Sequence, residues 1–195
     1  YWKKGDVIGD CFGGVGTTGI LGASAGLKVV SVELEPRFFA LAEANYGLHA
    51  DLWRRCGDPV PQMICGDSRK FAELVGPVVG MVTSPPYAAN EKSDYLLTED
   101  GTTRQRDERR GYKQGSGCFR GSENYGDVPG QVGRLREDRG EETYWQAMQV
   151  IYGECQKAIR PGGILAVVIK DYVKSKARVP LCEQTATLLE ACGFK

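Results

Sequence analysis

The sequence predicts an α/β domain with a mostly parallel sheet that helices cover on both faces. Over residues 1–83, short apolar runs alternate with segments of helical character, and most of the runs end in a polar residue. Such alternation is typical of parallel sheets, because a parallel strand reaches its neighbour through a crossover that is usually a helix. The 195 residues, 42% of them hydrophobic, are enough for one buried core. We therefore expect a single domain over residues 1–195.

Four strands and three helices are expected in the first half of the chain. The strands lie at residues 7–8, in a short apolar run that stops at Asp10, and at 28–32, 62–65 and 78–82. The second is largely β-branched, as in a strand buried on both faces. One helix covers residues 17–25 and ends at Gly26. A second begins at Pro36, which suits a first helical turn. A third covers 71–75, after a helix start at Asp67-Ser68.

Residues 88–140 interrupt this alternation. Within residues 101–140 there are nine glycines and fifteen charged residues, and the aliphatic residues are only Val128, Val132 and Leu135. Such a segment cannot bury a core of its own, so we interpret it as an insertion. Regular structure resumes with a helix over 141–159, a turn at 161–163, a strand over 164–169 and a last helix over 181–192.

Composition excludes several classes of protein. The 25 basic and 25 acidic residues give a net charge of zero, so no overall basic field indicates nucleic acid. His49 is the only histidine, which excludes a multi-histidine site, and we expect no metal. No apolar run approaches the roughly 20 residues of a membrane span, so we expect no membrane partner. Seven cysteines without a CxxC pair favour reduced thiols in a cytosol-like compartment.

A glycine-rich segment, DCFGGVGTTG at residues 10–19, follows the first strand and leads into the first helix. Glycines at such a junction let a ligand approach backbone N–H groups near the positive end of a helix. Gly14, Gly16 and Gly19 also match the GxGxxG pattern of nicotinamide and flavin enzymes. That cofactor class and a plain tight turn therefore remain alternatives, whereas a P-loop is excluded because no GK[ST] follows.

Three acidic residues, Asp10, Glu33 and Asp67, follow three successive strands. Glu33 stands about 20 residues after the loop, where an acid accepts hydrogen bonds from ribose hydroxyls. Asp10 would repel a pyrophosphate but suits a cationic amino group. Asp67 either accepts from an adenine amino group or only caps a helix. Together they predict a ligand with adenine, ribose and an ammonium-bearing tail, a description that S-adenosylmethionine fits.

The segment Thr83-Ser84-Pro85-Pro86-Tyr87 directly follows the fourth strand. Two prolines remove two backbone donors and hold the preceding residues extended, which gives a rigid corner rich in acceptors. Such a corner suits an amino group that must donate two hydrogen bonds, one to the Ser84 hydroxyl and one to the Pro85 carbonyl. The Tyr87 ring offers a face for stacking a base. The structural alternative is a proline turn that leaves a strand.

These segments together resemble the DNA amino-methyltransferases, which modify N4 of cytosine or N6 of adenine. DCFGGVGTTG resembles their cofactor loop D-P-F-x-G-x-G-T-T, with Cys11 in place of the usual proline. VVSVELEPRF at 29–38, Gly66-Asp67 and TSPPY look like their next three motifs, and PGGILAVVIKDY at 161–172 is similar to a later strand. The resemblance implies a Rossmann-like, S-adenosylmethionine-dependent methyltransferase fold, with some terminal elements of the family absent.

The resemblance also implies site residues. S-adenosylmethionine would be bound by Asp10, Phe12, Gly13, Gly14, Gly16, Thr17, Thr18, Glu33, Leu34 and Asp67. Among these, Glu33 would bind ribose, Leu34 would pack on adenine and Asp67 would accept from the adenine amino group. The catalytic target-base pocket would consist of Ser84, Pro85, Pro86 and Tyr87. No cysteine follows the prolines, so we expect direct methyl transfer without a covalent enzyme intermediate.

We expect the insertion, residues 88–140, to contact DNA, because ligands of open α/β sheets lie beyond the carboxyl ends of the strands. Its candidate phosphate contacts are Arg104, Arg106, Arg109, Arg110, Lys113 and Arg120, interleaved with Tyr112, Phe119 and Tyr125 for stacking. Lys170, at the end of the fifth strand, would face the same edge. A solvated surface loop is the structural alternative.

The function that these patterns favour is transfer of a methyl group to a DNA base, with the serine of TSPPY favouring N4 of cytosine over N6 of adenine. A protein or RNA amino-methyltransferase is an alternative, although such enzymes usually carry Asn before the two prolines. An NAD-dependent oxidoreductase would leave TSPPY unexplained and lacks a Tyr-x-x-x-Lys arrangement. A non-catalytic nucleic-acid-binding module is a fourth hypothesis. The favoured function predicts a cytoplasmic prokaryotic or phage enzyme of DNA methylation or restriction–modification.

Overall fold

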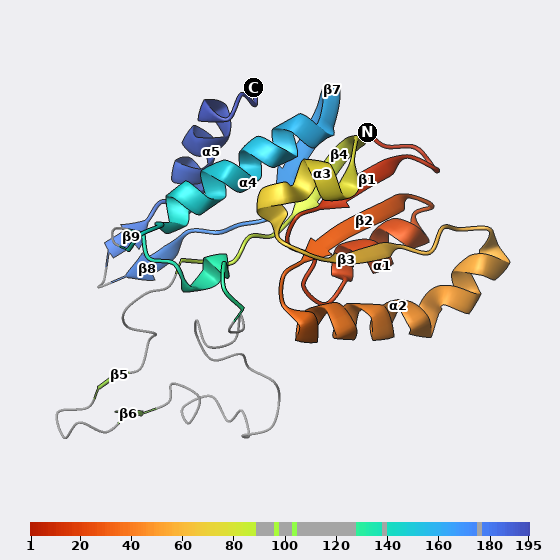
Figure 1. Ribbon diagram of the computed structural model, residues 1–195, viewed down its shortest axis with the longest axis horizontal. Coiled ribbons are helices and arrows are strands. Elements are labelled where there is room, and N and C mark those ends of the chain that lie inside the picture. The colour runs from red at the N-terminus through yellow and green to blue at the C-terminus, as the bar shows by residue number, and fades with distance from the viewer. Residues whose placement is uncertain (89–95, 98–102, 105–127, 138–139, 175–176) are drawn as a thin grey trace.

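The computed structural model describes residues 1–88, 96–97, 103–104, 128–137, 140–174 and 177–195. Its centre is a five-stranded sheet in the order β3-β2-β1-β4-β7 (Figure 1). The strands are β1 (Val7–Asp10), β2 (Lys28–Glu33), β3 (Gln62–Cys65), β4 (Val78–Thr83) and β7 (Ile159–Val167). Every neighbouring pair in this sheet is parallel, so the carboxyl ends of the strands lie at one edge.

Helices cover both faces of this sheet (Figure 1). One face carries α1 (Thr17–Ser24) and α2 (Pro36–Cys56), and the other carries α3 (Phe71–Val75), α4 (Tyr144–Ala158) and α5 (Leu181–Ala191). Two short 3-10 turns, η1 (Ser68–Lys70) and η4 (Val132–Arg134), precede α3 and α4. The predicted α/β class, with a parallel sheet between two helical layers, is confirmed.

The hydrophobic core has a part on each face of the sheet. The larger part joins β2 and β4 to α3 and α4 through Val32, Met81, Phe71, Met148 and Ile151, none of them more than 1% exposed. The smaller part packs α1 against α2 and β3, through Ala23, Ala42, Tyr46, Trp53 and Met63. Each large buried side chain contributes roughly 1.5–3 kcal/mol to folding. Burial on both faces therefore holds the strand ends, and the side chains that follow them, in fixed positions.

The fifth strand differs from its prediction. The sequence predicts a helix through residue 159, a turn at 161–163 and a strand over 164–169, whereas β7 already begins at Ile159 and ends at Val167. Gly162 has a φ of +80°, and the pairing register with β4 shifts between Val78 and Gly80. Gly162 and Gly163 therefore lie at a bulge within β7 and not in a turn before it. A bulge interrupts the pairing locally but leaves the chain in the sheet. Lys170 lies three residues beyond the strand end.

Two short hairpin pairings lie outside the main sheet. β5 (Leu96–Leu97) pairs with β6 (Thr103–Arg104), and β8 (Tyr172–Lys174) pairs with β9 (Ala177–Val179), both antiparallel. The first pairing belongs to the predicted insertion. Most of the candidate DNA contacts, from Arg106 to Tyr125, lie outside the described residues. Over the described part of the chain, no helix is both long and apolar enough to cross a membrane.

The start of α4 gives a test of local stability. Thr143 accepts a hydrogen bond from the Gln146 backbone N–H at 3.3 Å, and its own N–H donates to the Gln146 side chain at 2.8 Å, which is a complete capping box. We expect Thr143→Ala to lower the free energy of unfolding by about 1 kcal/mol.

Urea denaturation measures this change. Thr187→Ala in α5 is the control, because that exposed hydroxyl only donates to the carbonyl one turn earlier, that of Glu183. It should change the free energy of unfolding by less than about 0.5 kcal/mol. Equal losses in the two variants would contradict a capping role for Thr143.

Candidate active site

The acidic residues that the sequence singles out lie at the carboxyl edge of the sheet. β1 ends at Asp10, β2 ends at Glu33, and Asp67 follows β3 by two residues. β1 is central and lies between β2 and β4, so the chain order reverses on its two sides. Ligands of open α/β sheets bind in the crevice at such a switch point. The order of strands therefore places Asp10 at the most favourable position for binding.

Asp10 joins three segments of the site. Its Oδ1 accepts hydrogen bonds from the Phe12 backbone N–H at 3.0 Å and from the Thr83 hydroxyl at 2.7 Å, and the nearby Thr18 side chain also favours the charged carboxylate. The side chain is only 2% exposed. Burial raises the pKa of the Asp10 carboxyl, against the lowering effect of these hydrogen bonds. The glycine loop, the start of α1 and the TSPPY segment are thus tied to one buried acid.

The glycine loop is shaped by its own backbone and by Tyr46. The Gly13 N–H donates to Val32 and the Gly16 N–H donates to Gly13, each at 2.9 Å. Gly16 has a φ of +87°, and a Cβ there would lie 2.6 Å from the Tyr46 ring, so the position requires glycine. A Cβ on Gly14 would meet nothing within 4 Å. The loop therefore leaves space for a ligand above Gly14 while its far end packs on α2.

Glu33 is held by two backbone donors. Its Oε2 accepts the Gly14 N–H at 2.8 Å and its Oε1 accepts the Glu35 N–H at 2.9 Å. The residue is 9% exposed, and burial raises the pKa of its carboxyl, with the neighbouring Glu35 and Asp10 charges adding to the rise. Each carboxylate oxygen has a second lone pair. The arrangement therefore presents Glu33 as a fixed acceptor beside the glycine loop.

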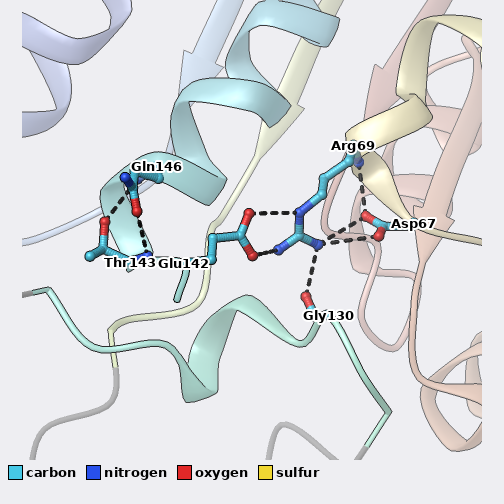
Figure 2. A network of polar contacts seen from close by, with 6 residues as sticks. All are labelled: Asp67, Arg69, Gly130, Glu142, Thr143 and Gln146. Carbon is cyan, nitrogen blue, oxygen red and sulfur yellow. Dashed lines mark hydrogen bonds and ion pairs between the residues drawn. The ribbon is translucent and has the colours of Figure 1, made fainter. Parts of the chain in front are cut away.

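Asp67 caps η1 and also lies in a network of ion pairs (Figure 2). Its Oδ1 accepts the Arg69 backbone N–H at 2.9 Å, and the Arg69 guanidinium lies 3.2 Å from both carboxylate oxygens. Arg69 in turn binds Glu142 and the Gly130 carbonyl. The sequence reading missed Arg69 and Glu142. The position of Arg69, two residues after Asp67, is the only signal that could have indicated it.

Leu34 lies near Asp67, as a shared adenine site would require. A Cβ on Gly130 would lie 3.5 Å from Asp67 Oδ2 and 3.9 Å from Leu34 Cδ2, so both side chains reach the same stretch of backbone. Glu35, which the sequence reading also missed, is 4% exposed and accepts the Val128 N–H at 3.0 Å. The end of the insertion therefore packs beside the predicted adenine end of the site.

The TSPPY segment is fixed from two sides. The Ser84 hydroxyl donates to the Val168 carbonyl at 3.1 Å, and the Pro86 carbonyl accepts the Tyr144 hydroxyl at 3.0 Å. Ser84 is exposed, whereas Pro85 and Pro86 are buried. The Tyr87 ring is half-buried and meets Tyr172 edge-on, with ring centroids 5.9 Å apart. The corner is therefore held on both sides, and Ser84 is its exposed residue.

The structure brings the predicted residues together in two groups that share an edge. Asp10, Gly14 and Glu33 are joined directly by the loop, and Thr83 links them to Ser84. Phe12, Gly13, Thr17 and Thr18 belong to the same loop and helix start by position. Among the described residues, no cluster of three or more His, Cys, Asp or Glu side chains is arranged to bind a metal ion. The roles of all these residues remain predictions.

Comparison with known proteins identifies the fold. No protein-family model matches the chain, and no curated protein does. A putative rRNA-methylase from Clostridium thermocellum is 13% identical with a TM-score of 0.55, over 100% of this chain and 74% of that one. An S-adenosylmethionine-dependent methyltransferase from Agrobacterium tumefaciens is 14% identical with a TM-score of 0.52, over 98% and 45%. Thermus thermophilus TrmN is 13% identical with a TM-score of 0.50, over 97% and 36%.

These likenesses show the fold of the S-adenosylmethionine-dependent methyltransferases, as the sequence predicts. They also show that the chain spans less than half the length of two of these three proteins.

The buried acid predicts a pH dependence of stability. The unfolded chain releases the Asp10 proton near pH 3.8, whereas the folded protein retains it to higher pH because burial disfavours the charged form. The folded state thus binds more protons in this range, so ionisation of Asp10 lowers stability as the pH rises toward neutrality. Asp10→Asn removes this cost and keeps an acceptor for Phe12 and Thr83. We expect the variant to exceed the wild type in unfolding free energy at neutral pH, with a smaller excess in acid.

Urea denaturation at about pH 4.5 and about pH 7.5 measures the difference. The exposed Asp51→Asn serves as control and should show no such pH-dependent gain. A difference between Asp10→Asn and wild type that does not grow with pH would contradict the assignment.

Proposed function

We propose that this chain transfers a methyl group from S-adenosylmethionine to the exocyclic amino group of a base in DNA, with N4 of cytosine favoured. The observation that carries the proposal is the 2.7 Å hydrogen bond from Thr83 to Asp10. It joins the first residue of TSPPY to the acid that begins the glycine loop. The proposed methyl-acceptor pocket and the proposed methyl-donor pocket therefore share one buried contact, which suits direct transfer between them.

The residues present fit S-adenosylmethionine by their chemistry. Open space lies at Gly14, Asp10 offers a carboxylate for the ammonium group, and Glu33 offers fixed acceptors for the ribose hydroxyls. Leu34 and Asp67 supply an apolar contact and an acceptor for adenine. When bound, S-adenosylmethionine supplies an electrophilic methyl group on its sulfonium. The protein is required only to bind it and to orient the amine.

The TSPPY corner supports the assignment of an amine as acceptor. Because the Ser84 hydroxyl donates its hydrogen to Val168, its remaining lone pairs are free to accept from an amino group. The Pro85 carbonyl offers the second acceptor, and neither proline has an N–H to compete. Two accepted hydrogen bonds would hold the amino nitrogen so that its lone pair faces the methyl group. Tyr87 would stack on the base, which a duplex presents only after flipping.

DNA as the partner rests on the position of the insertion. Ala88 follows the TSPPY corner, and the return of the chain at Val128 is bonded to Glu35 beside the proposed cofactor pocket. Both ends of the insertion therefore lie at the carboxyl edge of the sheet. Its residues 101–140 hold nine basic and six acidic residues, a local charge of +3 that suits contact with phosphates, whereas the acidic residues of 88–100 bring the whole insertion to zero net charge.

RNA is the second candidate substrate, because one solved structure with the same fold is described as an rRNA-methylase. Adenine N6 in DNA and a protein amide need the same two acceptors at Ser84 and Pro85 and remain alternatives of the same chemistry. An NAD-dependent oxidoreductase would leave this corner without a role.

The first experiment is therefore to incubate the protein with S-adenosylmethionine and unmethylated DNA and to identify methylated nucleosides by mass spectrometry.

Replacing Glu33 tests the cofactor pocket. We expect Glu33→Ala to weaken binding of S-adenosylmethionine at least about tenfold, since two hydrogen bonds from ribose to a charged group are lost. Isothermal titration calorimetry measures the dissociation constant. Glu43→Ala, on the exposed face of α2, is the matched control and should bind as the wild type does. Unchanged affinity in both Glu33→Ala and Asp10→Ala would remove the cofactor assignment.

Replacing Ser84 or Tyr87 tests the target pocket. We expect Ser84→Ala and Tyr87→Ala to keep the wild-type affinity for S-adenosylmethionine but to lower methyl transfer at least about a hundredfold, because orientation of the amine is lost. Nucleoside mass spectrometry after timed reactions measures the rate, and calorimetry on the same samples is the internal control. Full turnover by either variant would show that its residue is not part of the base pocket.

A further inference from the structure

The Arg69 side chain contacts three residues at the carboxyl edge of the sheet, Asp67, Gly130 and Glu142 (Figure 2). Its Nε and Nη2 donate to the two carboxylate oxygens of Glu142 at 3.3 and 2.7 Å. Its Nη1 donates to both Asp67 oxygens at 3.2 Å and to the Gly130 carbonyl at 2.9 Å. The guanidinium therefore connects the turn after β3, the end of the insertion and the residue before the α4 cap.

The pair with Glu142 fixes where Nη1 can lie. A bidentate contact aligns the plane of a guanidinium with the plane of a carboxylate. The Arg69 side chain is 18% exposed, so solvent competes weakly for these donors. Because Glu142 holds Nε and Nη2 of Arg69, the position and direction of Nη1 are also fixed. Nη1 then sets the orientation of the Asp67 carboxylate, which is itself 36% exposed.

This orientation leaves one acceptor free. Asp67 Oδ1 receives both the Arg69 backbone N–H and Nη1, whereas Oδ2 receives Nη1 alone among the hydrogen bonds of the described residues. A carboxylate oxygen accepts two hydrogen bonds. Oδ2 thus retains a lone pair, and a Cβ on Gly130 would lie 3.5 Å from this oxygen and 3.9 Å from Leu34. The free acceptor therefore lies beside Gly130 and Leu34, at the proposed adenine end of the site.

We propose that Arg69 is a positioning residue for adenine recognition: held by Glu142, it aims Asp67 Oδ2 at the adenine amino group and fixes Gly130 beside it. This inference rests on the proposed function, because it needs an adenine-bearing cofactor. Arg69 touches neither the cofactor nor the base and acts through Asp67. Lysine could not replace it, since one ammonium cannot make a bidentate contact with Glu142 while reaching Asp67 and Gly130.

The test is discrimination between two ligands that differ at the 6-amino edge of the purine. S-adenosylhomocysteine carries the amino donor, whereas S-inosylhomocysteine has an oxygen in its place and a hydrogen on the adjacent N1. We expect the wild type to prefer the adenosyl compound at least about tenfold, because an acceptor facing an oxygen is left unpaired. In Arg69→Gln and Arg69→Lys we expect the ratio of the two dissociation constants to fall to about threefold or less, as for loss of one oriented hydrogen bond. Calorimetry on the full chain measures both constants.

The ratio separates positioning from structural support. If Arg69 only stabilised the fold, replacing it would weaken the binding of both ligands equally and leave the ratio of their dissociation constants unchanged. Such a result would overturn the inference. Arg69→Lys retains the charge, so it gives the answer if Arg69→Gln unfolds. In Asp67→Ala, the ratio of the two dissociation constants should fall as it does in the Arg69 variants. Arg54→Gln is the matched control, because Arg54 pairs with exposed Asp51 at 2.9 Å on α2, away from Asp67, and its ratio should equal that of the wild type.

The same experiment distinguishes the two levels of the argument. If the wild type binds neither compound, the proposed function fails and this inference falls with it. If it binds both equally well, Asp67 does not read the amino group, and the inference is wrong while the cofactor assignment stands. If it discriminates and Arg69→Lys discriminates equally, Asp67 reads adenine without help from Arg69, which again overturns the inference alone.

Discussion

Asp10 is a carboxylate buried at the end of the central strand, and the arrangement of the whole edge depends on how its charge is accommodated. Burial of an unpaired charge is costly, so the side chain must be surrounded by donors. The backbone N–H of Phe12 and the hydroxyl of Thr83 supply them. Phe12 belongs to the glycine loop, which follows Asp10 directly, whereas Thr83 ends β4, 73 residues later in the sequence. Satisfying one acid therefore fixes the glycine loop against the TSPPY segment.

Fixed relative positions are what a group-transfer site needs, because most of its rate comes from alignment. The parallel sheet provides this alignment. The hydrophobic core on each face holds the strands in place, and the polar residues follow the strands at their carboxyl ends. Pro85 and Pro86 make the segment after Thr83 rigid as well. The Pro86 carbonyl accepts a hydrogen bond from the Tyr144 hydroxyl, which fixes this segment to α4. Loops thus carry the proposed chemistry, while strands and helices determine where the loops start and end.

Much of this arrangement could be predicted from the sequence, and the parts that could not share a physical cause. Glycines, prolines and acids next to a strand end are local patterns, so the loop, the TSPPY corner and the positions of Asp10, Glu33 and Asp67 were predictable. Arg69 and Glu142 are 73 residues apart on opposite sides of the insertion, and no local pattern links them. Gly162 predicts a turn by its residue type, but pairing with β4 keeps it in β7. Tertiary contacts decided each case that the sequence reading missed.

The two ends of the insertion are held by different parts of the site. At one end, Ala88 is 8% exposed and follows Tyr87, whose ring meets Tyr172 at the start of β8. At the other end, Glu35 holds Val128, Arg69 holds Gly130, and Tyr172 donates to Glu137 at 2.7 Å. Tyr172 therefore contacts both the proposed target pocket and the returning segment. With both ends fixed, a change in the length or sequence of the insertion between them need not disturb the edge of the sheet. A fold of this kind can alter what it recognises while its proposed donor and acceptor pockets stay in place.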